Sequence, residues 1–228
     1  DNRFLYEGGN PTLQPEKVFN VEAMMLYKWL NVSVGYKYLK DVMEWTKYIY
    51  PGKEFAYNTS LNFDHKQLLY ASVNVSPKFG IFRPTWGFNY NQQFFDTKKY
   101  GASKALSKPL LSCSLNNNFA LSETMNAAIR LNASTTHADG FLMMKSGYSV
   151  NLQFDKSFAN RTWIIYLSAN DIFKTAKERW TMYGLGAGTT KDCYNYTRNI
   201  SLQVTYNFNA KRSKYKGTGA GNEEKSRL

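Results

Sequence analysis

The segment Asn199-Ile200-Ser201-Leu202-Gln203-Val204-Thr205-Tyr206-Asn207-Phe208 alternates between polar and apolar residues at every step. Because successive side chains of a β-strand point to opposite faces, the apolar residues from Ile200 to Phe208 share one face and uncharged polar residues share the other. A strand of about ten residues with these two faces and an aromatic end is typical of a membrane-spanning β-strand. A half-buried strand of a soluble β-sandwich has the same pattern, so this segment alone does not separate the two classes.

The same period of two recurs upstream, which makes repetition the stronger argument. The apolar faces are built from aliphatic and aromatic residues, and the opposite faces mainly from Asn, Ser and Gly. The alternating segments are Phe19–Tyr27, Leu30–Tyr38, Leu69–Val75, Phe82–Tyr90, Leu111–Leu121, Met125–Ala133, Tyr148–Phe154 and Trp163–Ala169. Asn117 is a polar break in one apolar face. The sequence therefore predicts an all-β protein of about nine long strands.

The connections between these segments alternate between short and long. The short ones lie at Lys28–Trp29, Pro77–Gly80, Ser122–Thr124 and Lys156–Arg161. The long ones show no sustained period, and we expect them to be loops: Asp41–His65, Asp96–Lys108, Thr135–Met144 and Phe173–Asp192. Outer-membrane barrels have tight periplasmic turns and long outer loops, whereas a soluble sandwich has no reason to place all its long loops at one end. The pattern predicts an antiparallel up-and-down meander that is part of a transmembrane β-barrel.

Charged residues within the predicted strands lie on the polar faces. They are Glu22, Lys37, Arg130 and Asp155. A charge that faces lipid at mid-depth costs about 2–4 kcal/mol, so we expect these four side chains to face the lumen.

Composition excludes several other classes of protein. The longest apolar runs, Ala23–Tyr27 and Trp163–Leu167, are far shorter than the roughly 20 residues of a transmembrane helix. The net charge of +12 is scattered over the loops, apart from one dense basic run at Lys211–Lys216, so nucleic acid is not an expected partner. Cys113 and Cys193 are too few for a disulfide scaffold, and we expect free thiols. The first residues lack the pattern of a secretory signal, which predicts either a cytosolic chain or an internal or C-terminal piece of a longer one.

Several stretches resemble a known family. Gly9-Asn10-Pro11-Thr12-Leu13-Gln14-Pro15-Glu16 resembles the Asn-Pro-x-Leu-x-Pro-Glu signature in the barrels of TonB-dependent receptors. Asn170–Phe173 is similar to the end of their penultimate strand, and Val204–Asn209 to their closing strand. The segment Lys214–Asn222 is similar to the ends of the Bacteroidota outer-membrane β-barrel family related to those receptors.

The resemblance implies a barrel of about 22 strands around an N-terminal plug, in the outer membrane of a Gram-negative cell. Residues 1–208 would form the last nine strands, and residues 209–228 a basic, Gly-rich tail in the periplasm. The implied partners are outer-membrane lipid, the remainder of the barrel with its plug, the TonB complex through the parent protein, and the barrel-assembly machinery. The parent would take up a nutrient by energised transport. A passive or structural barrel, or a soluble all-β ligand-binding module that purifies without detergent, remain as alternatives.

The residues predict no enzyme, metal site or cofactor. His65 and His137 are the only histidines, and neither has Cys or carboxylate neighbours at metal-ligand spacing or a plausible nucleophile. The Gly184-x-Gly186-x-Gly188 motif lies in a predicted loop without the strand-turn-helix context of a phosphate site.

Aromatic residues of the long segments are the candidates for ligand binding. Their amphipathic rings suit stacking on sugars or other ligands at the outer mouth, although packing of loop on loop would use the same residues. They are Trp45, Tyr48, Tyr50, Tyr100, Trp180 and Tyr183. The four charged lumen residues are expected either to contact the plug or to be solvated.

Overall fold

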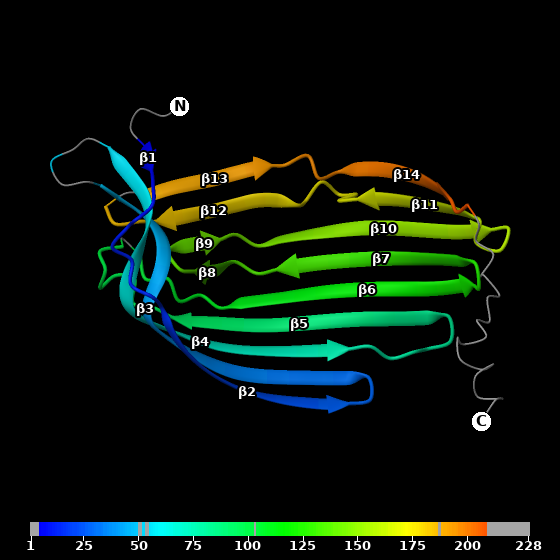
Figure 1. Ribbon diagram of the computed structural model, residues 1–228, viewed down its shortest axis with the longest axis horizontal. Helices are drawn as coiled ribbons and strands as arrows, with labels where there is room; N and C mark the ends of the chain where they lie inside the picture. The colour runs from blue at the N-terminus through cyan, green and yellow to red at the C-terminus, as the bar shows by residue number, and fades with distance from the viewer. Residues whose placement is uncertain (1–4, 50–51, 53–54, 103, 187, 209–228) are drawn as a thin grey trace, which may run out of the picture.

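A computed structural model describes residues 5–49, 52, 55–102, 104–186 and 188–208, which form fourteen β-strands (Figure 1). Within these ranges no helix is long and apolar enough to cross a membrane.

The main sheet is an antiparallel meander of nine strands. In lateral order they are β2 (Lys17–Tyr27), β3 (Leu30–Ile49), β4 (Ala56–Val75), β5 (Phe82–Phe94), β6 (Leu110–Ser122), β7 (Met125–Ser134), β10 (Gly147–Phe158), β11 (Trp163–Asn170) and β14 (Asn199–Tyr206). A short strand that the sequence did not predict, β1 (Leu5–Glu7), pairs in parallel with the start of β4. The predicted meander of about nine strands is confirmed.

The sheet has two open edges. β2 is the first strand in the lateral order and β14 the last, and no pairing joins them among the described residues. Each edge therefore presents a row of backbone N–H and C=O groups that the rest of the described sheet does not satisfy.

The apolar faces predicted from the alternation share one side of the sheet, and their large side chains are exposed. Examples are Phe19 at 61%, Val34 at 48%, Ile129 at 44%, Leu167 at 42% and Leu202 at 67% exposure. Cross-strand partners lie on the same face, and Leu167 pairs with both Phe154 and Leu202. In the described structure no second layer covers this face, in contrast to the sealed face of a β-sandwich.

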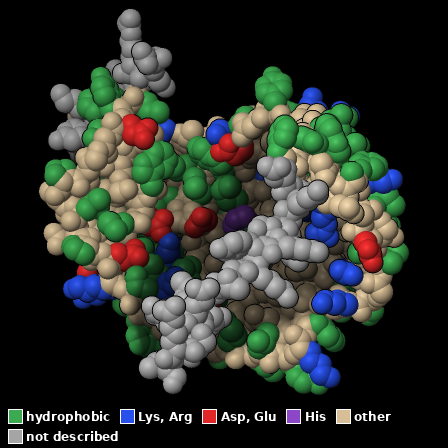
Figure 2. Space-filling view, turned by 45° about the vertical axis from the view of Figure 1, so that its right-hand side comes forward, with side chains coloured by type: hydrophobic (Ala, Val, Ile, Leu, Met, Phe, Trp, Pro, Cys, Tyr) green, Lys and Arg blue, Asp and Glu red, His purple; other side chains and the backbone are tan. Residues whose placement is uncertain are grey.

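The opposite, inner face is polar and hydrogen-bonded across strands. The Ser33 and Ser72 hydroxyls lie 3.0 Å apart, and the Ser168 and Ser201 hydroxyls 2.7 Å apart. Figure 2 looks obliquely into the hollow on this side, where acidic and basic side chains gather. Water or polar groups satisfy such a face, whereas hydrocarbon does not.

Asn117 now has a physical explanation. Its Oδ1 accepts a hydrogen bond of 3.0 Å from Nε1 of Trp86, which lies on the same apolar face of the neighbouring strand. A buried or lipid-facing indole N–H needs such a partner, so the polar break supplies one.

The Asp41–His65 segment is not a loop. β3 and β4 continue as a paired ribbon as far as Ile49 and Ala56. Asp41 has a left-handed backbone with φ of 55°, and the buried side chains change from odd to even numbers there, from Leu39 to Val42. This change of phase hid the strand, because a test for period two fails across it.

Two other long segments also contain strands where loops were expected. β8 (His137–Asp139) and β9 (Leu142–Met144) form one hairpin, and β12 (Lys177–Tyr183) and β13 (Gly188–Tyr194) form another. Their order, β13-β12-β9-β8, repeats the order β14-β11-β10-β7 of the strands that they extend (Figure 1). These strands are short or charged, so their alternation is weak. The described part of Asp96–Lys108 contains no strand, as predicted.

The end of the sheet where these hairpins stand, which we call the outer end, holds the hydrophobic core. Phe63 lies in its centre, with its ring centroid 4.9 Å from those of Tyr100 and Phe141 and 5.8 Å from that of Phe95. The buried members are Leu39, Val42, Phe63, Phe95, Ala102, Leu106, Ala138, Phe141 and Met143. We call this cluster the mouth core.

Backbone hydrogen bonds draw the two sides of the sheet together at the mouth. The turn between β12 and β13 bonds to the end of β3, from Leu185 N to Lys47 O at 2.6 Å and from Ile49 N to Leu185 O at 3.3 Å. β3 lies beside one edge of the main sheet and β12 continues β11 beside the other edge. The sheet is therefore curled at this end, with its polar face inside.

The mouth core also encloses an ion pair between Lys66 and Glu44, whose side chains are only 10% and 14% exposed. Glu44 lies in the part of β3 beyond its pairing with β2, outside the membrane-spanning length of about ten residues. Burial raises the pKa of Glu44, and the charge of Lys66 opposes that rise. Loss of Lys66 alone would leave a buried carboxylate without its counter-ion.

Gly35 leaves room for the end of the Tyr70 side chain where it crosses the inner face. The Tyr70 hydroxyl lies 2.9 Å from Asn20 Oδ1 and 3.2 Å from Glu22 Oε2 on edge strand β2, and a Cβ at Gly35 would lie 2.2 Å from Tyr70 Cζ. We expect Gly35→Ala to lower the free energy of unfolding by about 1–3 kcal/mol in micelles, measured by denaturant titration.

The control for Gly35→Ala is Gly147→Ala, because nothing lies within 4 Å of a Cβ added at Gly147. In the Tyr70→Ala background the Gly35→Ala change should cost little, since the clash is gone. Equal losses at the two glycines would contradict this explanation.

Candidate functional site

The four predicted lumen charges all lie on the inner face but not in one cluster. Lys37 on β3 pairs with Asn20 on β2. Glu22 lies two residues further along β2, beside the Tyr70 hydroxyl. Arg130 is flanked by two asparagines in the neighbouring strands. Asp155 accepts a hydrogen bond of 2.8 Å from the amide of Asn126. Because these four side chains are spread along the wall, they suit either contact with a wide body in the lumen or solvation by water. They do not form a single binding centre.

The predicted ligand-binding aromatics do not form one surface among the described residues. Tyr100 and Tyr183 pack in the mouth core, and Tyr48 lies edge to face with Tyr57. Trp180 donates a hydrogen bond of 3.0 Å to Glu178 Oε1, and Trp45 is 43% exposed. Tyr50 lies outside the described residues. Packing of loop on loop thus accounts for Tyr100 and Tyr183, and ligand stacking by these aromatics stays a prediction.

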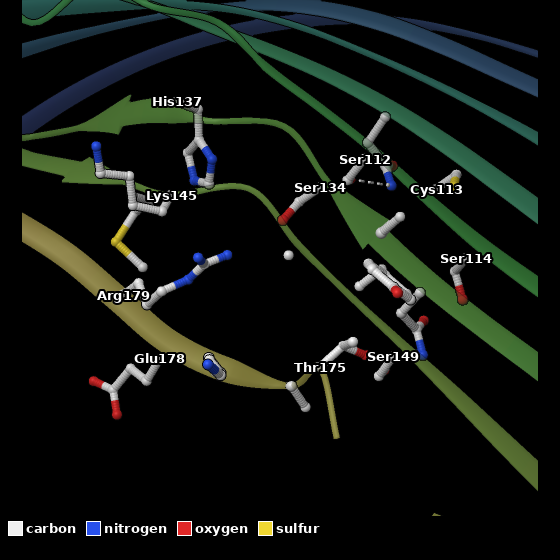
Figure 3. Close-up of a pocket in the computed structure, with 18 of the residues that line it drawn as sticks. Ser112, Cys113, Ser114, Ser134, His137, Lys145, Ser149, Thr175, Glu178 and Arg179 are labelled. Carbon is white, nitrogen blue, oxygen red and sulfur yellow. Dashed lines mark hydrogen bonds between the residues drawn. The ribbon is translucent and has the colours of Figure 1, made fainter. Parts of the chain in front are cut away.

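A polar recess of about 590 Å³ lies where the main sheet meets the two outer hairpins. The inner face of β6, β7 and β10 contributes the hydroxyls of Ser112, Ser114, Ser134 and Ser149. The outer hairpins and their links contribute His137, Lys145, Thr175, Lys177, Glu178 and Arg179 (Figure 3). We call this site the junction recess.

Two short links shape the junction recess through backbone hydrogen bonds. Lys145 N donates to Arg179 O at 2.9 Å, and Ser146 N donates to Thr136 Oγ1 at 3.0 Å. Arg179 Nη2 in turn donates to Ser146 O at 2.6 Å. The guanidinium is therefore held across the break between β9 and β10.

Asp171 holds the other link in place. Its side chain is almost fully buried, and its oxygens accept hydrogen bonds from Thr175 N at 2.8 Å, Ala176 N at 3.1 Å and Thr197 Oγ1 at 2.8 Å. Burial opposes its ionisation, but the bonds from Thr197, Thr175 and Ala176 outweigh that effect and lower its pKa. Asp171 thereby fixes the chain from the end of β11 to the start of β12.

Glu178 points away from the centre of the recess (Figure 3). Its carboxylate accepts hydrogen bonds from Lys191 at 2.8 Å, from the Trp180 indole and from Asn195 at 3.1 Å. These bonds lower the pKa of Glu178 to about 2. The Glu178 carboxylate therefore stabilises the β12–β13 hairpin and does not neutralise the cations of the recess.

No metal site was found among the described residues, since no three His, Cys, Asp or Glu side chains lie together in a suitable group. Cys113 and Cys193 are free thiols, as predicted.

A scan against protein-family models matches residues 1–206 to the model described as "Outer membrane protein beta-barrel family". The match spans nearly the whole chain. The chain belongs to the outer membrane protein β-barrel family. Searches of the curated proteins and of the solved structures gave no match.

Membership of the outer membrane protein β-barrel family explains the two faces of the main sheet. The uncovered apolar face contacts membrane lipid, the strands cross the outer membrane, and the polar face lies toward the lumen. The curled outer end with its mouth core then stands beyond the spanning part of the wall.

The sequence did not reveal the junction recess. Lys177 and Arg179 come from a segment that was expected to be a loop, and the serine hydroxyls come from three different strands. The one available signal was Asn170–Phe173, because the resemblance drew attention to Asp171, which orders one side of the recess.

Acid should weaken the β12–β13 hairpin. The pKa of Glu178 in the folded chain is about 2, below its ordinary value of 4.5, so its stabilising effect is complete above about pH 4.5 and is lost as the pH falls toward 2. A carboxyl carbon-13 titration of Glu178 in micelles should give a midpoint near 2, and the protection factors of the β13 amides should fall over the same range.

Glu178→Gln is the control for this titration. The variant should show a hairpin that is weaker at neutral pH and that no longer responds to acid between pH 4.5 and 2. A Glu178 midpoint near its ordinary value would show that the bonds from Lys191, Trp180 and Asn195 do not persist in solution.

Proposed function

We propose that this chain forms part of the wall, the outer mouth and the closing strand of a TonB-dependent-receptor-like barrel. Its parent protein would take up a scarce nutrient with energy delivered from the inner membrane. The chain itself would contribute surfaces and perform no chemistry.

One observation carries this proposal, namely the asymmetry between the two ends of the sheet. At one end the strands are joined by tight turns such as Lys28–Trp29, and at the other end the hairpins and the described part of the Asp96–Lys108 loop fold inward around the mouth core. Inward-folded outer segments leave a restricted entrance above a polar lumen, which suits selective entry of a ligand better than free diffusion.

The open edges and the inner charges support the same proposal. β2 and β14 need partner strands, which the remainder of a larger barrel would provide. The scattered charges Glu22, Lys37, Arg130 and Asp155 give a plug several polar contact points around the wall. The Gly9–Glu16 segment, which enters β2, carries the resemblance to TonB-dependent receptors.

Planar-bilayer conductance of the parent protein tests the proposal. A plugged receptor should show no steady conductance, and deletion of the plug segment should open a large channel. A steady open channel in the intact parent, or a parent without a plug, would favour a passive barrel. Nutrient uptake that persists in a strain lacking TonB would also overturn the proposal.

A further inference from the structure

We propose that the junction recess binds a ligand that joins an anionic group, such as a carboxylate or a phosphate, to a hydroxyl-rich body. The inference names a ligand class for the proposed uptake function and rests on that function for its biological role. The binding itself depends only on the recess.

The first argument is an excess of positive charge. Lys145, Lys177 and Arg179 line the recess, and none of them forms an ion pair with any described carboxylate. The carboxylate of Glu178, which comes from the same strand, is engaged by Lys191 instead. The recess is therefore a polar site with unneutralised cations, which favours an anion.

The second argument is the state of the Arg179 side chain. One terminal nitrogen is anchored on Ser146 O, which orients the guanidinium, and Nε is buried without a hydrogen-bond partner in the described structure. A buried donor without a partner is costly, and guanidinium geometry suits carboxylate and phosphate oxygens. Arg179 is thus oriented in advance, with a donor still unused.

The third argument concerns the body of the ligand. Opposite the cations, the wall presents the Ser114, Ser134 and Ser149 hydroxyls, none of which makes a side-chain hydrogen bond within the described ranges. Ser134 and Arg179 both point toward the centre of the recess in Figure 3. Hydroxyl groups both donate and accept, so they match a polyhydroxylated body better than an apolar one. A volume of about 590 Å³ is within the usual range for small-molecule sites.

The test uses the chain in micelles and four probes: glucuronate, glucose 6-phosphate, inorganic phosphate and glucose. Side-chain resonances of Arg179 should shift with the two anionic sugars, at concentrations at least about tenfold below those needed for glucose. Inorganic phosphate should bind more weakly than the anionic sugars if the serine wall contributes. Added salt should weaken the binding of both anionic sugars.

Arg179→Gln should weaken binding of the preferred anionic sugar by about tenfold, and Lys177→Gln, at an exposed position, should weaken it less. Lys98→Gln is the matched control, because Lys98 is an exposed lysine outside the recess and should leave binding unchanged. Equal affinity for glucose and the anionic sugars, or no effect of either recess variant, would overturn the inference. Inorganic phosphate binding as well as the sugars would reduce the site to an adventitious anion site and would also overturn it.

The outcome is separable from that of the proposed function. Binding in micelles without TonB-dependent uptake by the parent would contradict the transport proposal and support the binding site. Uptake by the parent that is unaffected by Arg179→Gln, together with no binding in micelles, would contradict the binding site and support the transport proposal.

Discussion

Replacing Phe63 with alanine should lower the free energy of unfolding of the outer mouth by about 3–5 kcal/mol. Phe63 is 6% exposed and contacts the rings of Phe95, Tyr100 and Phe141, so the truncated side chain leaves a cavity that these fixed rings do not fill. Denaturant titration in micelles, followed by amide exchange in β3, β4 and β12, would measure the loss and locate it.

Phe94→Ala is the matched control for the Phe63 variant. Phe94 is in β5, next to Phe95 in sequence, but is 51% exposed on the opposite face. Its truncation should cost clearly less in micelles. Similar losses for the two variants would contradict the conclusion that the outer end is held by a mouth core.

An arginine at position 202 should destabilise the membrane-inserted chain by about 2–4 kcal/mol, whereas an arginine at position 203 should have a small effect. Leu202 is on the apolar face of β14, and Gln203 follows it on the polar face in register with Tyr166. The two positions share strand and depth and differ only in face. Unfolding free energies of Leu202→Arg and Gln203→Arg in lipid bilayers test this directly.

The order of the two effects matters more than their size. If Gln203→Arg were as harmful as Leu202→Arg, the inner face would not be in contact with water. If neither had an effect, β14 would lie outside the membrane.

Sequence periodicity predicted the main sheet because each of its strands has lipid on one face and water on the other. Leu167 and Leu202 meet lipid while Ser168 and Gln203 meet water or polar groups, so the pattern continues for as long as the strand spans the membrane. In the upper part of β3 the inner side meets protein and not water, as at Val42, while Met43 and Trp45 on the other side are exposed. Apolar residues then lie on both faces, and alternation no longer marks the strand.

The upper part of β3 shows a second reason for the missed strands. A single residue in a left-handed conformation, Asp41, shifts the phase of every later side chain. The change depends on tertiary packing around Leu39 and Val42, and the residue types alone do not reveal it.

The candidate site was less predictable than the wall. Tyr100 and Tyr183 were predicted as ligand-binding aromatics, and their rings pack against the mouth core, because aromatic side chains serve packing and ligand contact equally well. The junction recess forms where the interruptions between β7 and β8, β9 and β10, and β11 and β12 lie side by side. Lys145 and Arg179 are 34 residues apart in sequence, and only the pairing of β9 with β12 brings them together.

The most direct test of the central claim is a spin-label scan of residues 199–206 in lipid bilayers, after replacement of Cys113 and Cys193. Collisions with oxygen, which concentrates in hydrocarbon, should peak at positions 200, 202, 204 and 206. Collisions with a water-soluble nickel complex should peak at 199, 201, 203 and 205. Uniform access of the nickel complex to all eight positions, or loss of the alternation, would contradict a wall with lipid on one face and water on the other.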